Sequence, residues 1–117
     1  MPARLRRADP ADVAAALERR TPADERLLTK HFLAVLAEQA PGSSVEVRVP
    51  PYAAAQVVAG VRHIRGTPPA VVETDPATWV ALATGELSWL DAVTQGRVRA
   101  SGERTDLSTH LPLEEDR

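Results

Sequence analysis

The side chains that could act in catalysis or bind a metal are scattered along this sequence. His31, His63 and His110 lie far apart, and no two of them have the spacing of a zinc site. The chain has no cysteine, which excludes disulfides, thiolate ligands and a cysteine nucleophile. We therefore expect no metal ion to be bound.

The sequence also lacks the motifs of common nucleophiles and nucleotide-binding loops. It has no G-x-S-x-G turn, no glycine-rich phosphate loop and no G-x-G-x-x-G pattern. Ser88 is better explained as a helix cap than as a nucleophile, and Asp75, two residues after Glu73, is needed to begin a helix at Pro76. The residues thus give no positive indication of a cofactor or of catalysis, and we expect neither; a small enzyme that uses His63 or Glu73 remains an open alternative.

Capping residues followed by proline mark the helix starts in the first third of the chain. Asp9 precedes Pro10 and predicts a short alanine-rich helix, whereas Thr21 precedes Pro22 and predicts a longer helix that ends near Ala40. Apolar residues fall on one face of the longer helix, which indicates packing against a sheet.

Alternation of apolar and polar residues predicts strands in the middle of the chain. Val45, Val47 and Val49 alternate with Glu46 and Arg48, which is typical of a strand with one buried face. Similar reasoning places the other strands at residues 52–59, 61–65, 70–74 and 97–101.

Two short helices are expected before the last of these strands. Asp75 begins the first, which carries Trp79 and ends at Gly85. Ser88 begins the second, which ends at Gly96 and has an apolar stripe formed by Trp89, Leu90 and Val93. A final helical turn is expected after Thr105 or Asp106.

The composition of the chain indicates which kinds of partner it can bind and in which cellular compartment it is expected. The 117 residues suffice for one domain, and the net charge of −2 argues against a nucleic-acid partner. Alanine makes up much of the 44% hydrophobic content, and aromatic residues are only 3%, so the core has few large side chains. No apolar run is long enough to insert into a membrane or to form a signal peptide, so we expect a cytoplasmic protein.

The last third of the chain resembles the closing half of a sterol carrier protein (SCP) domain. The stretch TWVALATGELSWLDAVTQGRVRASGERTDLSTHL has a glycine after each short helix and after the following strand, at Gly85, Gly96 and Gly102. Apolar positions of the family pattern are occupied by Leu82, Val93, Val98 and Leu107. Residues 24–112 are similar to small stand-alone SCP-like proteins of actinobacteria.

The resemblance implies an α/β (α+β) fold: a five-stranded, mostly antiparallel sheet with helices covering one face. It implies a noncatalytic role in which a fatty acyl chain, a lipid or a sterol-like ligand is bound or transferred in a cavity between sheet and helices. We expect the apolar wall to consist of Val58, Ile64, Val72, Trp79, Leu82, Trp89, Val93, Leu107 and Leu111. The polar mouth is expected at His63, Arg65 and Thr67.

We expect an N-terminal arm and short helix over residues 1–20, the SCP-like domain over residues 21–113, and a frayed acidic tail over residues 114–117. An accessory domain that closes its core completely, and meets a second copy of itself or another protein, is the alternative. An internal cavity would favour the lipid carrier, and an exposed apolar patch would favour the accessory domain.

Overall fold

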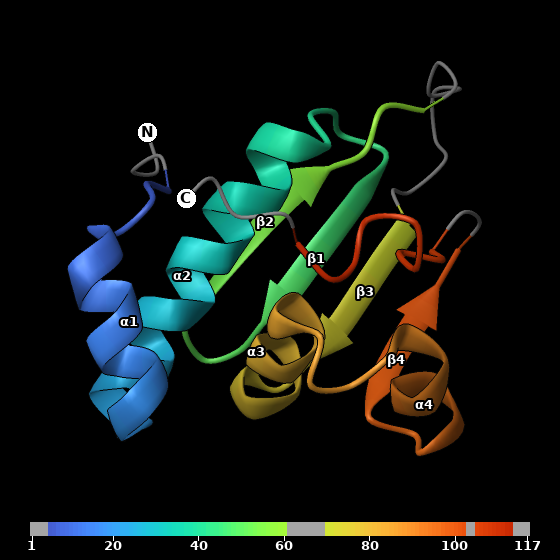
Figure 1. Cartoon of the computed structure of the whole chain (residues 1–117). Helices are drawn as coiled ribbons and strands as arrows, with labels where there is room; N and C mark the ends of the chain where they lie inside the picture. The colour runs from blue at the N-terminus through green and yellow to red at the C-terminus, as the bar shows by residue number, and fades with distance from the viewer. Residues whose placement is uncertain (1–4, 61–69, 103–104, 114–117) are drawn as a thin grey trace.

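The structure, a computed structural model, describes residues 5–60, 70–102 and 105–113, and all statements below refer to these residues (Figure 1). They form a layer of helices against a single mixed sheet. The helices are α1 (Pro10–Arg19), α2 (Pro22–Gln39), α3 (Pro76–Thr84) and α4 (Trp89–Thr94). The strands are β1 (Val45–Val49), β2 (Ala53–Val57), β3 (Ala70–Thr74) and β4 (Val98–Ser101).

The sheet of the described residues has four strands, not the five expected, in the order β2-β1-β3-β4. The strand expected at residues 61–65 lies outside the described residues. β1 pairs antiparallel with β2 and parallel with β3, and β3 pairs antiparallel with β4, so the expectation of a mostly antiparallel sheet holds. β3 lies on the side of β1 away from β2 and runs in the same direction as β1.

The helices lie on one side of this sheet (Figure 1). The expected bounds of β1 are confirmed, and Val45, Val47 and Val49 are all completely buried beneath the helix layer. Glu46 and Arg48 lie on the other face, where the Nε of Arg48 donates a hydrogen bond to Glu46. Strict alternation therefore predicted both the strand and its buried side correctly.

β2 is shorter than the expected strand 52–59 because the backbone turns at Val58. This residue has a φ of 66°, a left-handed conformation that a β-branched residue rarely adopts. Its carbonyl oxygen accepts hydrogen bonds from the backbone N–H of Ser44 at 3.1 Å and from the hydroxyl of Ser44 at 2.7 Å. These bonds tie the end of β2 to the residue before β1.

α2 is buried on several sides, not on the single face that its apolar pattern predicted. α1 packs against it through Val13 and Ala16, and α3 contacts it on another side. His31 of α2 is 6% exposed, its Nδ1 accepts a hydrogen bond from the backbone N–H of Ala8, and its ring packs edge-on against Phe32. α2 is therefore the central helix of the layer.

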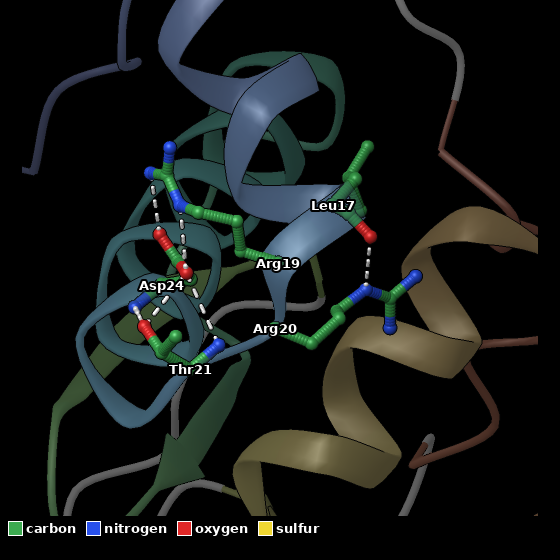
Figure 2. A network of polar contacts seen from close by, with 5 residues as sticks. All are labelled: Leu17, Arg19, Arg20, Thr21 and Asp24. Carbon is green, nitrogen blue, oxygen red and sulfur yellow. Dashed lines mark hydrogen bonds and ion pairs between the residues drawn. The ribbon is translucent and has the colours of Figure 1, made fainter.

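A polar network joins α1 to the start of α2 (Figure 2). The guanidinium of Arg19 donates to both carboxylate oxygens of Asp24, at 2.9 and 3.3 Å, and the backbone N–H and hydroxyl of Thr21 donate to Oδ2 of the same carboxylate. Arg20, at a φ of 55°, donates to the carbonyl of Leu17 and forms an ion pair with Glu86 after α3. Hydrogen bonds to Arg19 and Thr21 hold the pKa of Asp24 well below its usual range.

The apolar stripe expected on α4 is wrong. Leu90 is 72% exposed and Val93 is 46% exposed, whereas Ala92 is completely buried. Ala92 takes the inner position because the small side chain lets this six-residue helix lie close to its neighbours. After β4, the described chain forms a turn at residues 108–110 and no helix. None of the described helices combines the length and the apolar character needed to cross a lipid bilayer.

Candidate functional site

α3 is positioned over the sheet by a cap that the sequence predicted. The Asp75 carboxylate accepts hydrogen bonds from the backbone N–H of Thr78 at 2.8 Å and from its hydroxyl at 2.7 Å. Burial raises the pKa of Asp75, but these bonds and the charge of Arg97 outweigh it, so that the pKa lies below its ordinary value. Gly85 ends the helix in a left-handed conformation with a φ of 85°.

Trp79 of α3 points into the core between α3 and α2. Its side chain is 1% exposed, and its indole Nε1 donates a hydrogen bond to the carbonyl oxygen of Thr29 at 3.3 Å. The hydroxyl of Thr29 is buried and has no hydrogen-bond partner. The indole N–H is therefore paired with the backbone of Thr29, while the side-chain hydroxyl of the same residue is unpaired.

Four of the expected wall residues are fully buried, each about 1% exposed, and form what we call the buried set: Val72, Trp79, Leu82 and Leu107. They come from β3, from α3 and from the segment after β4. Val72, Trp79 and Leu107 belong to one hydrophobic cluster, together with Phe32 and Leu36 of α2. The structure thus brings together residues that are more than thirty positions apart in the chain.

Three other expected wall residues are half-buried and pack against that same cluster; they form what we call the half-buried set: Val58, Trp89 and Leu111. They come from the end of β2, the start of α4 and the C-terminal segment. Val93 is a wall candidate that the structure places on the outer surface of α4. The exposure of the candidate wall residues therefore increases from the core to the surface of the protein.

The remaining wall candidate, Ile64, and the mouth candidates His63, Arg65 and Thr67 lie outside the described residues. No described group of three or more His, Asp or Glu side chains is arranged to hold a metal ion. The buried set contains no acid, base or nucleophile, so what this region can do chemically is to enclose apolar groups.

Sequence reasoning missed the role of residues 105–113. This segment crosses the helix side of the sheet toward α2 (Figure 1), and it buries Leu107 and Leu113 in the core. The backbone N–H of Leu113 donates to the carbonyl of Ala83 in α3 at 3.0 Å. Sequence reasoning placed Leu107 and Leu111 in a helical turn and in the apolar wall, and it assigned no role to Leu113.

Sequence reasoning also missed a polar surface pocket at the ends of β1 and β3, lined in part by Arg97 and Arg99. Sequence reasoning placed both arginines on the strand expected at residues 97–101, but it did not indicate which residues of other strands lie beside them. The register of β4 with β3 supplies that information.

Comparison with known protein families gives a match over most of the chain. A protein-family model described as bacterial SCP ortholog matches residues 19–113, which is most of the chain. A comparison with curated proteins gives no match. The matched region contains α2, α3, α4 and all four described strands. The chain therefore belongs to the family of bacterial SCP orthologs, that is, of sterol carrier protein-like proteins.

Proposed function

We propose that the protein binds an apolar small molecule, with a fatty acyl chain as the best candidate, between its sheet and its helices, and that it catalyses no reaction. The family indicates lipid binding or transfer in general. The observation that supports the finer proposal most is the continuity of the apolar residues: the half-buried set, Val58, Trp89 and Leu111, packs on the cluster that holds Val72, Trp79 and Leu107.

The driving force is the removal of apolar ligand surface from water. Burial is worth about 0.8 kcal/mol for each methylene group. Because the buried set is about 1% exposed, a ligand must separate side chains that are packed closely in this structure. We propose that it enters beside Trp89 and Leu111 and displaces residues 105–113, which are held by the burial of Leu107 and Leu113 and by the backbone hydrogen bond from Leu113 to Ala83.

Native mass spectrometry of freshly purified protein and titration with a fluorescent fatty acid test this proposal. We expect one ligand per chain, and affinity that increases with chain length by about 0.8 kcal/mol for each added methylene until the space is filled. Replacement of Trp89 or Leu111 by alanine should weaken binding.

The matched control is Leu90→Ala, which removes a 72% exposed side chain next to Trp89 and should leave fatty-acid binding unchanged. Absence of ligand in both measurements would refute the proposal. Equal loss in Trp89→Ala and Leu90→Ala would move the site to the outer surface of α4.

A second candidate function is an interaction domain with a closed core. It is favoured by the exposure of Leu90 and Val93, which are three residues apart and therefore lie on one side of α4. In that case Leu90→Ser should abolish association with a second copy of the chain or with a partner protein, and no fatty acid should bind. Size-exclusion chromatography with light scattering, run beside the fatty-acid titration, separates the two functions.

A further inference from the structure

A surface pocket of about 280 Å³ lies where β1 and β3 end and β4 begins. Pro50 at the end of β1, Glu73 and Asp75 at the end of β3, and Arg97 and Arg99 at the start of β4 contribute to its lining. Its volume is close to the lower end of the roughly 300–1,000 Å³ that small-molecule pockets occupy. The pocket therefore has room for a small organic molecule as well as for a bare ion.

This pocket is separate from the apolar site. Side chains of consecutive strand residues point to opposite faces of a sheet. Val72 is buried under the helices, so Glu73 lies on the uncovered face, where it is in register with Arg48 of β1 and Arg99 of β4. A ligand that contacts Glu73 and Arg99 consequently does not compete with an acyl chain that contacts Val72.

The two arginines of the pocket have hydrogen-bonding capacity to spare. The side chain of Arg99 makes no hydrogen bond or ion pair with another described residue. The guanidinium of Arg97 makes one hydrogen bond, from Nε to the hydroxyl of Thr78 at 3.1 Å, so that its two terminal nitrogens are unused. A guanidinium presents its donors in a planar fork that matches the two oxygens of a carboxylate or a phosphate.

The two acidic residues of the pocket formally balance the charges of its two arginines, but Asp75 is directed at the start of α3. Both oxygens of the Asp75 carboxylate already accept hydrogen bonds from Thr78, as the cap of α3. The N-terminus of α3 also lies at the pocket, and its dipole adds a positive potential there. Moreover, the carboxyl ends of the parallel strands β1 and β3 form this edge, which is where open α/β sheets commonly bind ligands.

We propose that this pocket binds a small soluble organic anion whose carboxylate or phosphate group is held by Arg97 and Arg99. Pro50, Gly96 and the start of α3 enclose the remainder of the ligand. The proposal does not depend on lipid binding, because no residue that lines the pocket belongs to the buried set or to the half-buried set.

NMR titration of the full chain with glycerol 3-phosphate tests the proposal. We expect saturable shifts of the backbone amides of Gly96, Arg97 and Arg99. Arg99→Gln should weaken binding about tenfold or more, since it removes a charge-assisted hydrogen-bonding group. Arg99→Lys, which keeps the charge but loses the fork, should weaken binding to an intermediate extent. Glu73→Gln should strengthen binding because it removes a negative charge next to the anion.

Arg26→Gln is the matched control, because it removes one exposed positive charge from α2 and should leave the affinity unchanged. Shifts that do not saturate, or an equal loss of affinity in Arg26→Gln and Arg99→Gln, would overturn the proposal. Vesicles of phosphatidylglycerol test the lipid headgroup as another source of phosphate. Vesicle binding that depends on Arg99, without binding of glycerol 3-phosphate, would also overturn it.

Discussion

The effect of a buried polar atom in the helix layer on the stability of the protein depends on whether the atom has a hydrogen-bond partner. The indole N–H of Trp79 is paired with the carbonyl of Thr29, whereas the hydroxyl of Thr29 is completely buried and unpaired. A buried hydroxyl without a partner costs about 1–3 kcal/mol of stability. Replacement of such a group by an apolar group of the same shape removes this cost.

Thr29→Val is therefore expected to increase the free energy of unfolding by about 1 kcal/mol, because valine has nearly the shape of threonine and a similar helix propensity. Chemical denaturation of the two proteins measures the difference. A loss of stability would contradict this interpretation, since it would mean that the hydroxyl has a partner in solution.

The two tryptophans should respond differently to truncation. Trp79 is 1% exposed, so Trp79→Ala should lower the free energy of unfolding by about 3–5 kcal/mol. Trp89 is half-buried, so Trp89→Ala should cost less stability and should act mainly on fatty-acid uptake. Denaturant unfolding and the fluorescence titration, performed on both variants, check this. An equal loss of stability in both variants would place Trp89 in the core.

The carboxylate of Asp24 should make stability depend on pH. Its pKa is held below the ordinary value of 3.8 by hydrogen bonds from Arg19 and Thr21. The lower pKa in the folded state means that the charged form contributes stability above about pH 4, and that this contribution is lost as the pH falls further. Asp24→Asn should thus lower the midpoint of thermal unfolding at neutral pH, by an amount that shrinks below about pH 4. A difference that is constant with pH would contradict this assignment.

Helices and strands could be predicted from the sequence where no tertiary contact overrides the local pattern. Alternation located β1, and the caps at Asp75 and Ser88 located α3 and α4. β2 ended early because a tertiary contact, from Ser44 to the carbonyl of Val58, overrides the extended conformation that the sequence favours. In α4 the alanine at position 92 faces inward, which hydrophobic patterning cannot indicate when larger apolar residues stand beside it.

The turn between α2 and β1 depends on the absence of a side chain at Gly42. A Cβ there would lie 2.2 Å from the carbonyl oxygen of Val58, and the φ of 149° is unfavourable for other residues. Gly42→Ala should therefore cost about 3 kcal/mol or more. Gly96→Ala, where φ is 71° and no atom lies within 4 Å, should cost only about 1–2 kcal/mol. Denaturation curves of both variants measure the two losses of stability. Equal losses would refute the role of the close approach of Gly42 to the carbonyl of Val58.

For the whole molecule, the sequence indicated which residues are apolar and on which elements they lie, but not how the two faces of the sheet are used. The family and most of the helix layer followed from glycines and caps at fixed spacings. The grouping of Leu107 with Val72 and Trp79 was expected only through the family resemblance, and the pocket at Arg99 and Glu73 follows only from strand order and register. Contacts between distant segments of this kind have no local signal.

In the proposed function, an acyl chain lies between the sheet and the helices. Nuclear Overhauser effects between a ¹³C-labelled fatty acid and the methyl groups of the protein test it most directly. We expect contacts from the acyl chain to Val72, Leu82 and Leu107, and none to the exposed methyl groups of Leu90. Contacts confined to Leu90 and Val93, or the absence of any contact, would contradict it.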